Sequence, residues 1–124
     1  MPVLDFNLED RSPFERVFRT SKDARLPELE IQILDGSTPV NLTGATGATF
    51  SMDDVNGTAK VNAASATISD AANGKIKYAW AAADVDTEGE FEGQFVVTQS
   101  AGKDYRIPNV SNQKLRVIIG PRVN

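Results

Sequence analysis

Five carboxylates in the second half of the chain are the residues best placed to do chemistry. They recur at every second position: Asp84, Asp86, Glu88, Glu90 and Glu92. Carboxylate oxygens bind calcium, and a pair of carboxylic acids supplies the acid and base of glycoside hydrolysis. The spacing does not match the calcium loop of an EF-hand. We therefore favour a solvated acidic edge that faces a partner, with a metal site as the alternative.

The residue types on which most enzymes depend are missing from this sequence. Its 124 residues include no histidine and no cysteine. The commonest general base, the Cys and Ser-His nucleophile systems and typical zinc sites are therefore excluded. We expect a protein that is not an enzyme and that holds no metal ion or cofactor.

Charge and hydropathy argue against two classes of partner. The formal net charge is -4, so a polyanion such as nucleic acid is repelled on average. No apolar stretch approaches the ~20 residues that span a bilayer. The first ten residues carry three acids, where an export signal needs a basic patch and then an apolar run. We expect no nucleic-acid partner, no membrane contact and synthesis in the cytoplasm without a signal peptide.

From Leu26 onward, short runs of alternating apolar and polar residues are separated by turn residues, a pattern typical of half-buried strands. About seven strands are predicted, around residues 29–33, 48–52, 60–63, 66–69, 75–80, 91–97 and 114–119. Each has one face to bury and no long amphipathic helix to bury it against. The fold class predicted for residues 26–124 is all-β, an antiparallel β-sandwich in two layers, with a small barrel as the alternative.

The first 25 residues differ from the rest and are predicted to form an N-terminal arm. Residues 3–8 alternate like a strand, whereas residues 14–18 have helical spacing behind Ser12 and Pro13. A strand-like arm can add to the open edge of a neighbouring sheet. The candidate interface therefore combines the apolar side chains of the arm with the acidic edge: Val3, Leu4, Phe6, Leu8, Phe14, Phe18, Glu88, Glu90 and Glu92.

Tyr78 and Trp80 admit two interpretations. Aromatic rings stack on sugars in carbohydrate-binding modules, but their period-two spacing with Ile76 predicts a place in the core. We expect Phe91 and Phe95 to pack against this strand. Such packing would replace the disulfide and the tyrosine bond that hold the corresponding corner of antibody domains.

Several short sequence motifs follow one another in order over residues 22–119. A proline precedes the first strand (Pro27), a Pro-Val-x-Leu-Thr-Gly segment starts at Pro39, and an Asp-Thr-x-Gly-x-aromatic corner starts at Asp86. An Ile-Pro-Asn segment and the closing strand KLRVIIG follow. In this order and spacing the chain resembles the N-terminal domain of bacteriophage baseplate upper proteins.

The resemblance implies an immunoglobulin-like β-sandwich that serves as an assembly module of the tail or baseplate in the virion. Its partners would be other phage structural proteins, with a homo-oligomer inside the particle. Two alternatives share parts of this pattern. A head-associated or decoration protein would have the same fold and different neighbours. A carbohydrate-binding module would need Trp80 exposed to solvent.

Overall fold

Strands make up almost all of the regular structure in the computed structural model, which describes residues 3–8, 14–25, 27–100, 103–108 and 113–121. Within these residues there are ten strands: β1 (Val3–Asn7), β2 (Phe14–Ser21), β3 (Leu29–Asp35), β4 (Thr38–Pro39), β5 (Gly47–Asp54), β6 (Ala59–Asp70), β7 (Lys75–Tyr78), β8 (Gly89–Ser100), β9 (Lys103–Ile107) and β10 (Gln113–Gly120). Two single 3-10 turns are η1 (Ala71–Asn73) and η2 (Ala82–Asp84). The all-β prediction is confirmed.

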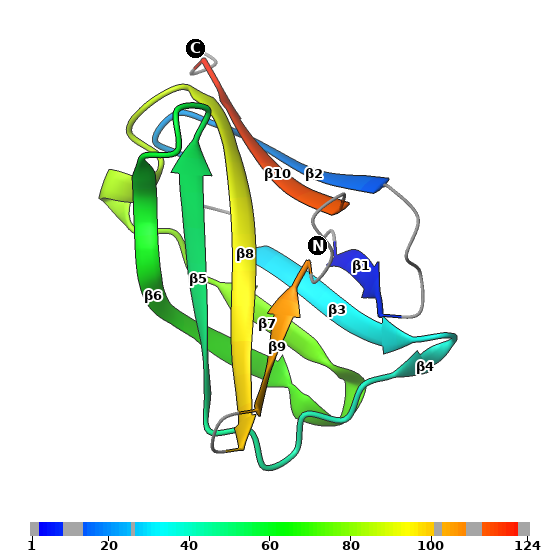
Figure 1. Cartoon of the computed structure of the whole chain (residues 1–124). Coiled ribbons are helices and arrows are strands. Elements are labelled where there is room, and N and C mark those ends of the chain that lie inside the picture. The colour runs from blue at the N-terminus through cyan, green and yellow to red at the C-terminus, as the bar shows by residue number, and fades with distance from the viewer. Residues whose placement is uncertain (1–2, 9–13, 26, 101–102, 109–112, 122–124) are drawn as a thin grey trace.

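The strands form a continuous sheet that curls until it is nearly a barrel. Their order is β1-β3-β7-β6-β5-β8-β10-β2, with β4 beside β3 and β9 beside β8. The twelve-residue strand β6 makes the sheet continuous, because it pairs with β5 in its first part and with β7 in its last. In Figure 1, β6 runs beside β5 and then turns beneath β7. The architecture is thus intermediate between the two-layer sandwich predicted from the sequence and the small barrel given as its alternative.

Two strand pairs are parallel, so the prediction of an antiparallel sheet was wrong for them. β1 pairs in parallel with β3, and β2 pairs in parallel with β10. Parallel neighbours need a long connection between them. Here β2 intervenes between β1 and β3, and most of the domain intervenes between β2 and β10. Alternation within a single strand carries no information about such distant pairings.

The N-terminal segment does not stand apart from the sheet as an arm. Its described residues contribute β1 and β2, which accounts for part of the difference between about seven predicted strands and the ten observed. Phe6 and Phe18 are 2% and 4% exposed and belong to the core. The helical alternative for residues 14–18 was also wrong, since strand pairing with β10 decides the conformation there.

The centre of the core is an aromatic cluster around Phe50 of β5. Its ring centroid lies 4.8 Å from those of Tyr78 and Phe95, and 5.9 Å from that of Trp80. Phe95 was expected to pack against the strand of Tyr78, and in this cluster both rings contact Phe50. Gly93 of β8 makes room for the Phe50 ring, because a Cβ atom at Gly93 would lie 2.9 Å from it.

Gly93→Ala should therefore lower the free energy of unfolding by about 1–3 kcal/mol, the usual cost of overpacking a core. Gly47→Ala is the control, because a Cβ atom at Gly47 meets nothing within 4 Å. It should leave stability unchanged or raise it by up to about 1 kcal/mol. Urea denaturation of both variants measures the difference. Equal stability of the two variants would contradict the close contact between Gly93 and Phe50.

Candidate functional site

The outer face of β8, β10 and β2 contains Glu90 and Glu92, two of the five carboxylates of the acidic edge predicted from the sequence. Glu90 and Glu92 point outward from β8 and are half exposed, and outward-pointing basic residues of β10 lie beside them. Lys114 Nζ lies 3.5 Å from Glu92 Oε1, and Arg116 Nη1 lies 3.6 Å from Glu90 Oε1. Arg116 Nη2 also lies 2.9 Å from Glu15 Oε2 of β2. We call Glu15, Glu90, Glu92, Lys114 and Arg116 the charged face.

The charged face is a surface of matched rows of opposite charge. The register of β8 and β10 produces this match, because Arg116 lies opposite Glu92 and Ile118 lies opposite Glu90. Side chains also reach the diagonal position on the next strand, so Arg116 pairs with Glu90 and Lys114 pairs with Glu92. Exposed ion pairs of this kind contribute about 0–1 kcal/mol each. They can exchange partners at little cost, so the face can meet charges of either sign on a neighbouring protein.

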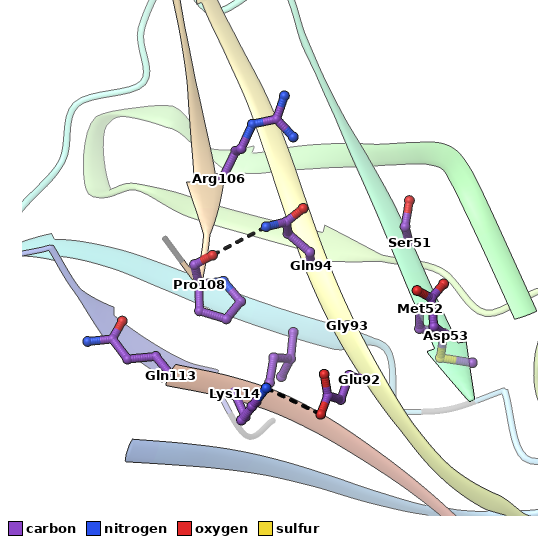
Figure 2. Close-up of a pocket in the computed structure, with 11 residues that line it drawn as sticks. Ser51, Met52, Asp53, Glu92, Gly93, Gln94, Arg106, Pro108, Gln113 and Lys114 are labelled. Atoms are coloured by element: carbon purple, nitrogen blue, oxygen red, sulfur yellow. Dashed lines mark hydrogen bonds and ion pairs between the residues drawn. The ribbon is translucent and has the colours of Figure 1, made fainter. Parts of the chain in front are cut away.

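A hollow of about 340 Å³ borders the charged face. It lies where the strand beside β8 changes from β10 to β9. Gly93 lies opposite Leu115 of β10, whereas Phe95 lies opposite Ile107 of β9. The two neighbouring strands diverge between these positions and leave the hollow shown in Figure 2. Gln94 Nε2 donates to the Pro108 carbonyl at 3.4 Å across it. The polar lining comes from Ser51, Asp53, Glu92, Gln94, Arg106, Gln113 and Lys114.

A second hollow lies between the β5–β6 hairpin and the start of β8. Asp54 Oδ1 accepts hydrogen bonds from the Asn56 and Thr58 amides at 2.8 and 3.0 Å, which fixes the hairpin turn. The turn presents Val55, which is 78% exposed and is the exposed large apolar side chain of the described residues. Glu88 lines the opposite wall. The hollow therefore joins an apolar tip to the acidic edge.

The remaining acids of the predicted run are used inside the chain. Asp84 is 8% exposed, and its Oδ2 accepts from the Tyr78 hydroxyl at 2.6 Å and from the Ala81 amide at 2.8 Å. Asp86 pairs with Lys60 at 2.6 Å, and this hydrogen-bonded ammonium lowers the pKa of Asp86 below its ordinary value. Among the described residues no group of three or more carboxylates is arranged to hold a metal ion.

The apolar candidates of the N-terminal segment fall into different environments. Phe6 and Phe18 are buried in the core, so they do not offer a free surface. Val3, Leu4 and Leu8 are half-buried along β1 and just beyond it. The side chain of Phe14 lies outside the part that the structure describes. Only some of the apolar arm residues are thus accessible to a neighbour in this conformation.

The two aromatic residues considered as a sugar platform are both buried. Trp80 is 3% exposed and Tyr78 is 4% exposed. Both pack on Phe50, as the core interpretation predicted. The best candidate platform for carbohydrate binding is thereby removed. Across the described ranges, no helix has the length and apolar character needed to cross a membrane.

Sequence reasoning missed the basic row and the hairpin tip. Lys114 and Arg116 occupy alternate positions of the last strand, as Glu90 and Glu92 do on β8. This shared period was visible in the sequence, but nothing in it paired β8 with β10. The hairpin tip at Val55 follows β5 directly. Its place beside the start of β8 depends on the pairing of β5 with β8, in which Asp53 lies opposite Glu92.

Comparison with known proteins identifies a family and solved structures of similar fold. Residues 12–120 match the family model described as the BppU N-terminal domain. The chain is similar in structure to a solved domain described as the N-terminal domain of phage TP901-1 ORF48, with a TM-score of 0.59 and 20% sequence identity. That similarity covers 95% of this chain and 96% of the other, and it concerns the fold. No curated protein sequence matches significantly.

The buried bond between Tyr78 and Asp84 gives stability a pH dependence. Burial, followed by the hydrogen bond to Asp84 and its charge, raises the pKa of Tyr78 well above the ordinary value of 10.0. Above about pH 10 the unfolded chain loses the phenol proton while the folded chain keeps it. The free energy of unfolding therefore falls as the pH rises. Tyr78→Phe should cost about 1–3 kcal/mol near neutral pH by removing a donor from buried Asp84. This deficit should shrink above pH 10.

Urea denaturation of the wild type and Tyr78→Phe between about pH 8 and pH 11 measures the effect. Tyr105→Phe is the control, because Tyr105 lies half-buried on β9 and belongs to a different strand pair. A difference between wild type and Tyr78→Phe that stays constant across this range would show that the phenol is not held in its protonated form.

Proposed function

Because the chain belongs to the BppU N-terminal domain family, the N-terminal domains of phage baseplate upper proteins, we propose that it is an adaptor that joins neighbouring proteins in a phage tail. A structural role in the tail or baseplate follows from the family. The match covers residues 12–120, nearly the whole described fold, and is the observation that carries the proposal. The adaptor role, the contacting surface and the presence of several copies in one particle are our inferences.

We further propose that the fold is a variant of the immunoglobulin-like sandwich. In the order of neighbouring strands, β1-β3-β7-β6 corresponds to the ABED sheet of such domains, and β5-β8-β10 corresponds to CFG. The parallel β1–β3 pair and the shared strand β6 are departures from that plan. Loops and sheet faces of immunoglobulin-like domains commonly serve as contact surfaces, which suits an assembly module.

The charged face and the two hollows beside it form the surface that we assign to the neighbour. Glu90 and Glu92 are 50% and 55% exposed, and their partners on β10 are 26% and 39% exposed. The face combines charges of both signs with an adjoining apolar tip at Val55. Such a surface favours a specific orientation of a protein partner, because like charges opposed across an interface cost several kcal/mol.

Catalysis and the other proposed roles receive less support. The carboxylates of the corner are bonded to Tyr78 and Lys60, and the sequence offers no histidine or cysteine. The buried Trp80 weakens the carbohydrate-binding alternative, and the family favours the tail over a head decoration. We retain as proposals synthesis in the host cytoplasm, location in the virion tail, and no binding to nucleic acid or membrane.

Glu90→Lys with Glu92→Lys should prevent the chain from entering tails. The double change reverses one charged row and puts it beside Lys114 and Arg116, so both the internal pairing and the complementarity to a neighbour are lost. Incorporation should fall at least about tenfold, the effect of roughly 1.4 kcal/mol. It is measured as the amount of this chain in purified tails after expression of the variant in the phage.

Glu28→Lys with Asp70→Lys is the matched control, because it makes the same change of charge where the sheet is formed by β3, β7 and the last part of β6, away from the charged face. Glu28 pairs with Lys77 at 3.4 Å, and Asp70 Oδ2 accepts from Asn73 Nδ2 at 2.8 Å, so this double variant also loses side-chain contacts. Circular dichroism checks that both variants are folded. Normal incorporation of the Glu90 and Glu92 variant would show that the charged face does not contact the neighbour.

A further inference from the structure

The first strand is attached to the domain along one edge. Among the described residues, β1 pairs with no strand other than β3, over five registered positions from Val3 with Glu30 to Asn7 with Leu34. Phe6 is buried, and Leu4 and Leu8 are partly buried against the core. From the next strand, Arg16 Nε donates to the Asp5 carbonyl at 2.8 Å.

The second strand is anchored independently of β1. β2 lies at the opposite end of the strand order, where it pairs with β10 over eight positions. The segment after it is tied down as well: Lys22 N donates to the Gly120 carbonyl and Asp23 N to the Val85 carbonyl, both at 2.8 Å. β1 can therefore leave β3 without breaking any pair of β2. The family match also begins at residue 12, after β1.

The site that β1 occupies on β3 is specific for this strand. Leu4 lies opposite Ile31, and Phe6 lies opposite Ile33. At the end of the strand, Asn7 Nδ2 donates to the Gly36 carbonyl at 2.9 Å, and Gly36 N donates to Asn7 Oδ1 at 3.0 Å. Backbone register, apolar contacts and this reciprocal pair together select a strand with the sequence of β1. A second copy of the chain supplies an identical strand.

We propose that β1 is exchanged between copies of this chain, so that β1 of one copy lies on β3 of another. The contacts are the same within one chain and between two, so the balance depends on the effective concentration of the second copy. Dilute chains keep β1 on their own β3. Copies held side by side in an assembly exchange it. The role of this exchange rests on the proposed function, because exchanged strands would link adjacent copies of the chain in the tail.

Mixed single-cysteine variants test the exchange, because the wild-type chain contains no cysteine. Glu30 has a registered neighbour on each side: Val3 on β1 and Lys77 on β7. Registered neighbours in a sheet lie within the distance range of a disulfide. A concentrated mixture of Glu30→Cys and Val3→Cys chains should form a covalent heterodimer on oxidation, at least about fivefold more than the control mixture.

The control mixes the same Glu30→Cys chain with Lys77→Cys. β7 lies inside the strand order, between β3 and β6, and cannot exchange unless the domain unfolds. Its heterodimer therefore measures random encounters of exposed cysteines. If a variant fails to fold, the second registered set replaces the first: Gln32→Cys mixed with Asp5→Cys, and with Lys75→Cys as the control.

Heterodimer yields equal to the control in both sets would overturn the exchange. That result would leave the tail role intact, because the mixture contains no other tail protein. Conversely, loss of tail incorporation in the charged-face variant with normal crosslinking would locate the contact with neighbouring proteins separately from the exchange. The two inferences therefore fail in distinguishable ways.

Discussion

The packing of the Phe50 ring into the space left by Gly93 is the contact on which the rest of the domain depends. It lets β5 and β8 pair closely while one large ring reaches Tyr78, Trp80 and Phe95. A buried aromatic side chain of this size contributes roughly 1.5–3 kcal/mol through its apolar surface alone. The chain has no disulfide to perform this task. The two curved halves of the sheet are thus held together by ring contacts.

The corner before β8 is positioned by the same cluster. Tyr78 packs on Phe50 and uses its hydroxyl to hold Asp84, and Asp84 in turn fixes the turn at Ala81. Asp86 then lies within reach of Lys60 on β6. The chain enters β8 in the register that turns its glutamates outward beside β10. A charged outer face therefore follows from an aromatic core.

Much of the fold was predictable because period-two alternation reports directly which side of a strand is buried. The predicted inward rows of β3, β5, β8 and β10 are all buried, including Ile31, Phe50, Phe95 and Val117. The candidate site was predictable only in part. Glu90 and Glu92 were expected outward and are outward, but their pairing with Arg116 and Lys114 needs the β8–β10 register. Asp84 was expected at the surface, and Tyr78 draws it inside.

The sequence by itself determined that the protein is all-β, that it lacks the residues of common catalytic sites, and which motifs connect it to its family. These properties are local, since each depends on residue types and short spacings. The tertiary structure decided the parallel pairing of β1 with β3 and of β2 with β10, the near closure of the sheet and the pairing of the acidic row with basic residues. Each of these joins segments far apart in the chain, and alternation within one strand does not specify which distant strand will lie beside it.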